Sequence, residues 1–162
     1  MNNEIIKPNQ LQLIFPKEIY NKVNLREISM QIIKKLTNMS DKWIFRFQSA
    51  IDELCSNAIE YGCSDNGKIS LAFSAVPDNF IEVSVEDNGQ GTKQINAEQM
   101  KEILEKEQQE EMGNFSSIRG NGLTKIVKII VDQINFYDLP QGGLKVIIKK
   151  SLQKETEKIQ FL

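Results

Sequence analysis

A carboxylate and an amide lie four residues apart in the stretch IDELCSNAIEYG, which runs from residue 51 to residue 62. Glu53 and Asn57 share one face of the amphipathic helix that this stretch predicts, because residues four apart are neighbours on a helix surface. A polar side chain that is buried without a partner costs about 1–3 kcal/mol. The pair therefore faces either solvent or a ligand that supplies the missing partners.

A second group of residues follows a predicted strand, in the stretch VEDNGQG. Asp87 places a hydrogen-bond acceptor at the end of that strand. Gly89 and Gly91 let the backbone approach a ligand closely or adopt positive φ in a turn. An ordinary Asp-Asn-Gly turn without a ligand is the alternative.

A third group precedes a predicted helix, in the stretch IRGNGLTKIV. Free backbone N–H groups at a helix start, reinforced by the helix dipole, form a site for anions. Arg119 would add charge-assisted hydrogen bonds to a phosphate. A hinge ahead of the helix, formed by Gly120 and Gly122, is the alternative. Two familiar phosphate motifs do not fit, because G-x-x-x-x-G-K-[ST] is absent and Lys125 stands where a dinucleotide fingerprint has its third glycine.

The N-terminal third of the chain predicts the elements that position the first group. Apolar and polar residues alternate over 11–15 and then meet Pro16, which is typical of a strand at a sheet edge. Apolar residues at helical spacing follow over 23–36, and they predict a helix with Asn24 as its N-cap. Ser40 caps the next helix, which carries Glu53 and Asn57 and ends at Gly62 as a C′ glycine.

The remaining elements complete a predicted α+β fold. Alternating runs over 67–76 and 79–87 predict adjacent antiparallel strands. A polar segment follows, with a short surface helix over 97–112, and its length is typical of a lid. A helix over 123–134 precedes two closing strands, in NFYDL and GLKVIIKK. This order predicts a two-layer α/β sandwich with a mixed, mostly antiparallel sheet and helices on one face.

Composition narrows the class of protein further. The 162 residues suggest one domain, and a net charge of −2 provides no electrostatic footprint for nucleic acid. No apolar run reaches the roughly 20 residues that span a bilayer, and the N-terminal stretch lacks the features of a signal peptide, so we expect a cytoplasmic protein. The chain has no histidine, which excludes Ser-His-Asp and Cys-His catalysis on this chain. Cys55 and Cys63 cannot form a zinc site alone and are interpreted as buried or incidental thiols.

Taken in order, the three groups resemble the N, G1 and G2 boxes of the GHKL ATPase superfamily: E-L-x-x-N-A-x-x-Y-G, D-x-G-x-G and R-G-x-G-L. The superfamily shares the Bergerat, or histidine-kinase-like ATPase, fold. Within it the chain resembles the compact anti-sigma factor/serine-protein kinase family. The likeness covers residues 10–150, with tails at 1–9 and 151–162 and the lid at about 92–119.

The resemblance implies roles for the first residues of these boxes. By similarity, Asn57 holds Mg²⁺ through its side-chain oxygen, since Mg²⁺ takes hard oxygen ligands. Glu53 resembles the general base that accepts a proton from an incoming hydroxyl as the γ-phosphoryl group moves. Asp87 matches the residue that accepts a hydrogen bond from the adenine amino group.

The resemblance also implies contacts between backbone and nucleotide. Gly89 and Gly91 match glycines against which the base and ribose lie, and Arg119 would neutralise phosphate charge. The phosphate-cradling turn and the residue that follows it correspond to Gly120, Asn121, Gly122 and Leu123. Three features depart from the family pattern, one of them being Ser116 and Ser117 before Arg119, which are interpreted as loop residues. Tyr61 stands where histidine is common, and the lid is longer and more acidic, so its glutamates are expected to face solvent or a partner.

The function that the resemblance implies is a Mg-ATP-dependent protein serine/threonine kinase. It would phosphorylate a small STAS-type antagonist protein and sequester a sigma factor in the alternative partner state, with nucleotide controlling the exchange. A homodimer is favoured, without nucleic-acid or membrane partners. Two alternatives stay open: a non-catalytic ATP-binding switch, and a detached ATP-binding domain of a histidine kinase whose phosphoacceptor lies in trans.

Overall fold

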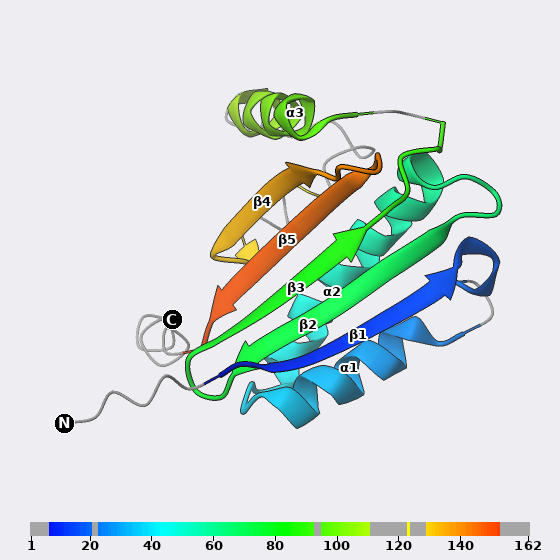
Figure 1. Cartoon of the computed structure of the whole chain (residues 1–162). Helices are drawn as coiled ribbons and strands as arrows, with labels where there is room; N and C mark the ends of the chain where they lie inside the picture. The colour runs from blue at the N-terminus through cyan, green and yellow to red at the C-terminus, as the bar shows by residue number, and fades with distance from the viewer. Residues whose placement is uncertain (1–6, 21–22, 93–94, 111–122, 124–128, 153–162) are drawn as a thin grey trace.

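A computed structural model of the chain describes residues 7–20, 23–92, 95–110, 123 and 129–152 (Figure 1). These residues form strands and helices, and each kind is numbered in the order in which it occurs along the chain. The strands are β1 (Asn9–Pro16), β2 (Lys68–Val76), β3 (Phe80–Glu86), β4 (Gln133–Asp138) and β5 (Leu144–Ser151), and the α-helices are α1 (Leu25–Leu36), α2 (Asp41–Asn57) and α3 (Ala97–Glu110).

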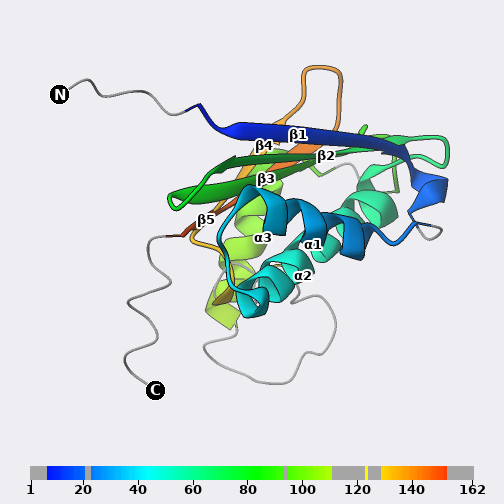
Figure 2. The same cartoon turned by 90° about the horizontal axis from the view of Figure 1, so that it is seen from below.

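The strands form one sheet in the order β1-β2-β3-β5-β4, and every neighbouring pair is antiparallel. Helices α1 and α2 cover one face of this sheet, and α3 lies on the same side, next to β4 (Figures 1 and 2). The predicted α+β class with helices on one face is confirmed. The strands that the structure describes contain no parallel pair, although the sequence indicated a mixed sheet.

The helix starts follow from the capping residues that the sequence predicts. Asn24 caps α1, and its Oδ1 accepts a hydrogen bond of 3.1 Å from the Glu27 N–H. Ser40 is the N-cap of α2, but its side chain makes no capping hydrogen bond. The Ser40 carbonyl oxygen instead accepts the first helical hydrogen bond, from the Ile44 N–H at 2.9 Å. The predicted cap positions are therefore confirmed, while the expected Ser40 side-chain bond is absent.

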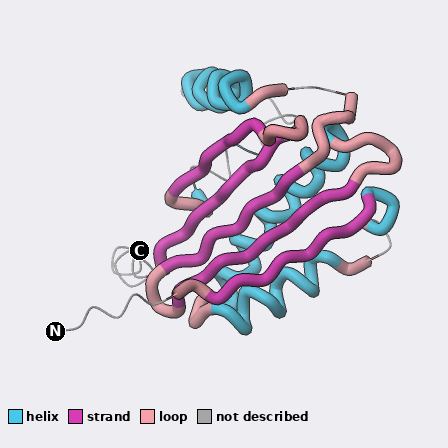
Figure 3. Tube along the Cα trace, viewed as in Figure 1, coloured by secondary structure: helices cyan, strands magenta, loops and turns pink. Residues whose placement is uncertain are grey.

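The core lies between the sheet and the helices α1 and α2. Strand residues alternate between this core and the open face of the sheet. Figure 3 shows the strands side by side as one sheet, with the helices α1 and α2 behind it. Each fully buried large apolar side chain contributes about 1.5–3 kcal/mol. Those with almost no exposed surface include Phe47, Ile51, Leu71, Phe73, Ile81 and Ile148. The described helices include none with the length and apolar character needed to span a lipid bilayer.

The predicted helix over 123–134 is wrong at its C-terminal end. Ile134 belongs to β4, where it pairs with Ile148 of β5. The Asp132 N–H donates to the Lys149 carbonyl oxygen at 2.9 Å, so the chain already runs beside β5 directly before β4 begins. The apolar residues Ile130 and Ile134 are four apart, a spacing that fits one face of a helix and one face of a strand alike. Residues 124–128 of this predicted helix lie outside the described residues.

The predicted C′ glycine at Gly62 is also wrong. The α-helical part of α2 ends at Asn57, and the chain continues as a single π-helical turn, η2 (Ala58–Gly62), with Cys63 as its C-cap. Gly62 is not among the described residues with positive φ, so the helix does not end in a left-handed glycine. Its lack of a side chain instead leaves room for the Asp87 carboxylate.

Candidate functional site

A cavity of about 690 Å³ lies among α2, the η2 turn, the ends of β3, β4 and β5, and the start of α3. Segments that are far apart in the sequence therefore meet at one place. The lining of this cavity combines an apolar floor, which includes Val85, Phe136 and Val146, with a few polar groups on the walls. Such a combination is typical of a site for a small organic ligand.

Five of the predicted site residues line this cavity: Glu53, Asn57, Asp87, Gly89 and Leu123. Gly91 lies just behind the wall, where its N–H donates to the Gly62 carbonyl oxygen at 3.2 Å. The remaining predicted residues lie outside the described residues: Arg119, Gly120, Asn121 and Gly122. The structure thus brings the first two predicted groups together with Leu123.

Glu53 and Asn57 lie on the wall that α2 contributes. Both side chains are half-buried, and neither has a hydrogen-bond partner among the described residues. The π turn follows directly and is wider than an α-helical turn, a feature that is frequent at functional sites. It adds Glu60, Tyr61 and Gly62 to the same cavity. The Glu53 and Asn57 side chains therefore face a cavity, not a sealed core.

Tyr61 lies close to the two carboxylates of this wall. A hydrogen bond to Glu60 raises the pKa of the Tyr61 phenol above 10.0, and the charges of Glu60 and Glu53 add to the effect. The phenol therefore stays neutral at physiological pH. It is a hydrogen-bonding group on the wall, next to the Glu53 carboxylate.

Asp87 follows β3 directly and lies at the other end of the polar lining. Its Oδ1 accepts hydrogen bonds from the Gly89 N–H at 2.8 Å and from the Leu144 N–H at 3.2 Å. Burial raises the pKa of this carboxyl above 3.8, although the two backbone hydrogen bonds act in the opposite direction. Oδ2 accepts no hydrogen bond from the described residues. It is the oxygen that is left to bind a ligand.

Close backbone packing fixes the position of Asp87. A Cβ atom on Gly62 would lie 2.9 Å from Oδ1 of Asp87, and closer still to Cγ and Oδ2. Gly143 has a φ of 99°, and a side chain there would overlap the Asp87 carbonyl oxygen. Sequence reasoning missed both roles. The signal for the second was the Gly-Gly pair directly before β5.

The polar groups of the α2 wall fit a magnesium ion that is shared with a phosphate. Asn57 provides a hard oxygen donor that has no partner among the residues that the structure describes. The described residues contain no group of three or more His, Cys, Asp or Glu that could hold a metal alone. Mg²⁺ is commonly held by one or two protein ligands together with substrate phosphates and water. The donor set therefore fits an ion that is bound together with a phosphate-bearing ligand.

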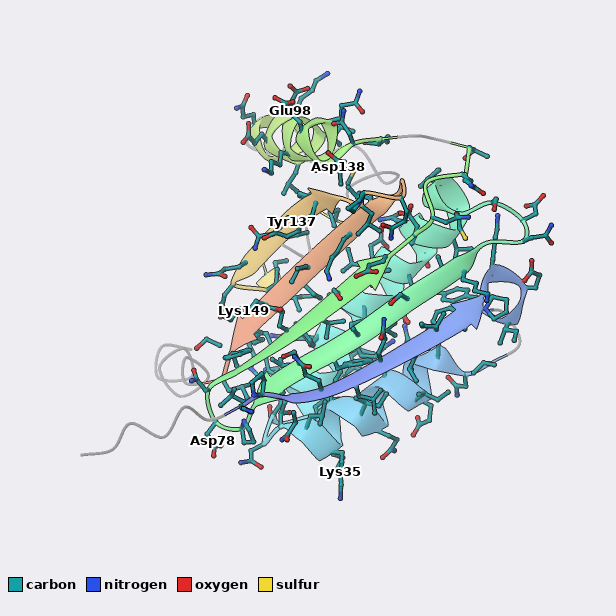
Figure 4. The ribbon with its side chains drawn as sticks, in the orientation of Figure 1. Lys35, Asp78, Glu98, Tyr137, Asp138 and Lys149 are labelled. Carbon is teal, nitrogen blue, oxygen red and sulfur yellow. The ribbon has the colours of Figure 1, made fainter. Side chains whose placement is uncertain are left out.

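Helix α3 forms the remaining wall. Ile95, Met100 and Ile103 line the cavity from this side. Three glutamates of the helix, Glu98, Glu102 and Glu105, are exposed, and Figure 4 shows Glu98 on the side of α3 that points away from the sheet. The expectation that the lid glutamates face solvent or a partner agrees with the exposure of these three.

Comparison with known proteins identifies the family. A family model described as histidine kinase-, DNA gyrase B- and HSP90-like ATPase matches residues 44–154. No curated protein matches the chain. The matched range begins within α2 and extends past β5, so it includes every element that lines the cavity. This match and the cavity between the N and G1 boxes show that the chain is an ATP-binding domain that belongs to the histidine kinase-, DNA gyrase B- and HSP90-like, or GHKL, ATPase family.

Proposed function

We propose that the protein is a Mg-ATP-dependent protein serine/threonine kinase of the anti-sigma factor type. Its acceptor would be a small STAS-type antagonist protein. The observation that carries this proposal is the Glu53 carboxylate, which has no hydrogen-bond partner among the described residues. It lies one helical turn from Asn57, in the cavity that Asp87 also lines. A carboxylate in this position is available as a proton acceptor, in addition to the groups that bind the nucleotide.

Asp87 and Asn57 would bind the two ends of ATP. The Asp87 Oδ2 atom accepts a hydrogen bond from the exocyclic amino group of adenine, while the apolar floor contacts the ring. Asn57 holds Mg²⁺ through its amide oxygen, and the ion, when bound, neutralises charge that develops on the transferred phosphoryl group. Arg119 and the turn at residues 120–122 would contact the phosphates.

Glu53 would act as the general base. The hydroxyl of the acceptor serine or threonine transfers its proton to the Glu53 carboxylate while its oxygen forms a bond to the γ-phosphorus. The bond between that phosphorus and the oxygen bridging to the β-phosphate breaks, and ADP leaves with the electron pair. Glu53 then releases the proton to water. This chain has no histidine, so a phosphoacceptor histidine would lie outside it.

The proposal extends to the partners of the kinase. In the alternative partner state the protein would sequester a sigma factor, as a homodimer, with ATP or ADP deciding between the partners. The exposed glutamates of α3 support this part of the proposal, because they lie on the helix that forms one wall of the cavity. A partner bound there would be sensitive to the nucleotide.

A labelling experiment tests the kinase. The protein is incubated with Mg²⁺, ATP labelled on the γ-phosphate and STAS-type proteins from the same organism. We expect acid-stable label on one of them, and Glu53→Gln should slow transfer about 10²- to 10⁴-fold while ATP still binds. Glu82→Gln is the matched control, because Glu82 is also half-buried but lies on the open face of the sheet. Acid-labile label, or transfer that Glu53→Gln leaves unchanged, would contradict the proposal.

A further inference from the structure

The first turn of α3 is capped from two sides. Asn96 Oδ1 accepts a hydrogen bond from the Gln99 N–H at 2.8 Å, and Gln99 Oε1 accepts one from the Asn96 N–H at 3.0 Å. This reciprocal pair is a capping box. In addition, Asp138 Oδ1 accepts a hydrogen bond from the Ala97 N–H at 2.8 Å. Figure 4 labels Asp138 at the end of the sheet next to α3.

The two caps differ in what they connect. The capping box joins residues of the α3 segment to each other, so it moves with the helix. Asp138 is the last residue of β4, so its carboxylate joins the helix to the sheet. The carboxylate also brings a negative charge to the positive end of the helix dipole, which stabilises the contact further. Asp138 is thus an anchor as well as a cap.

The anchored turn belongs to the wall of the nucleotide cavity. Ile95, Met100 and Ile103 line this cavity, and so does Asp138 itself. Helix α3 buries few apolar side chains, Ala97 and Leu104 among them, and much of its surface is charged. Apolar packing therefore holds α3 at a limited number of positions, with Met100 packed against the core beside them. The hydrogen bond from the Ala97 N–H to Asp138 adds a directional contact that fixes where the first turn lies against the sheet.

We propose that Asp138 is a positioning residue for the nucleotide site. Its carboxylate holds the first turn of α3 against β4, and this contact keeps the apolar side chains of α3 against the bound ligand. The inference rests on the proposed function only in taking that ligand to be ATP. Loss of the anchor lets the wall move away, so the nucleotide leaves faster while the rest of the pocket is unchanged.

Hydrogen exchange of the nucleotide-free protein tests the anchor itself. In Asp138→Ala, the backbone amides of the first turn of α3, from Ala97 to Met100, should exchange about two- to tenfold faster than in the unchanged protein. Asp138→Asn keeps a side-chain oxygen but loses the charge, so its exchange should fall between the two. Asp132→Ala is the matched control, since Asp132 accepts a backbone hydrogen bond of 2.7 Å from Ser151 just before the start of β4.

Stopped-flow release of a fluorescent ATP analogue tests the effect on the site. The dissociation rate should rise about two- to tenfold in Asp138→Ala, with partial rescue in Asp138→Asn and no change in Asp132→Ala. Exchange of α3 that is equal in Asp138→Ala and Asp132→Ala would overturn the inference. A dissociation rate that Asp138→Ala leaves unchanged would overturn it too. If the unchanged protein does not bind the analogue, the proposed function fails instead, and the exchange data still decide whether Asp138 anchors α3.

Discussion

We expect Asp87→Asn to separate ligand recognition from folding in this protein. The asparagine side chain keeps an oxygen that accepts the two backbone hydrogen bonds now made by Oδ1, from the Gly89 and Leu144 N–H groups. An amide NH₂ group then takes the place of Oδ2. It presents a donor to the amino group of adenine, which is itself a donor. The fold should therefore survive while recognition of the base is lost.

The expected loss of affinity follows from the hydrogen bond that is removed. A hydrogen bond to a charged group contributes about 1.5–3 kcal/mol. Since each 1.4 kcal/mol is tenfold in affinity, the dissociation constant for ATP should rise about 10- to 150-fold. Isothermal titration calorimetry measures this change. Asp132→Asn is the control, because Asp132 also accepts a backbone hydrogen bond but does not line the cavity.

The shift in the pKa of Asp87 fixes the sign of the change in stability that Asp87→Asn causes. Burial raises the pKa of Asp87 in the folded protein above 3.8, so the folded state binds more protons than the unfolded state between the two pKa values. The free energy of unfolding of the unchanged protein therefore contains a contribution that is present at low pH and lost as pH rises through the folded pKa. Asparagine carries no such proton. At about pH 7, Asp87→Asn should be at least as stable as the unchanged protein.

Urea denaturation across pH checks this linkage. The advantage of the variant should shrink as pH is lowered toward about 4, because protonation then removes the unfavourable buried charge. Two results would refute the reasoning. One is an ATP affinity equal to that of the unchanged protein. The other is a variant that is less stable at neutral pH, which would mean that the charge of Asp87 supports the fold.

Three further substitutions test other parts of the site and fold. Gly62→Ala should weaken ATP binding about tenfold or more, because the added Cβ overlaps a carboxylate that two backbone hydrogen bonds hold in place; unchanged affinity would show that Asp87 moves freely. Asn57→Ala should reduce the share of ATP affinity that depends on Mg²⁺, so a chelator should weaken binding less in the variant than in the unchanged protein. An equal effect of the chelator on both would remove Asn57 from the metal site. Asn24→Ala should lower the free energy of unfolding by about 0.5–2 kcal/mol through loss of the α1 cap, without changing ATP affinity; no change in the urea midpoint would argue against the cap.

Local patterns in the sequence were sufficient to predict much of the fold. The cap at Asn24 and the alternating strands β1, β2, β3 and β5 depend on residues within a few positions of each other. The same holds for Glu53 and Asn57, whose spacing alone places them on one helix face. These features were therefore predictable without knowledge of the tertiary structure.

The features that sequence reasoning missed depend on contacts between distant segments. Nothing near Gly62 indicates that the Asp87 carboxylate lies against it, and the π turn has no local sequence signature comparable to a cap. The start of β4 was missed because its apolar spacing also fits a helix, and only pairing with β5 decides between the two. The anchor at Asp138 needs the end of β4 and the start of α3 to meet. The roles of Arg119 and residues 120–122 stay predictions.

The central claim is that the cavity between α2 and the end of β3 binds adenine through Asp87. Calorimetric titration with ATP and with GTP, each in the presence of Mg²⁺, tests it most directly. Guanine places a carbonyl oxygen where adenine has its amino group, and two acceptors would then face each other. We expect saturable heat with ATP and none with GTP at about millimolar concentration. Equal binding of the two nucleotides, or no heat with either, would contradict the account.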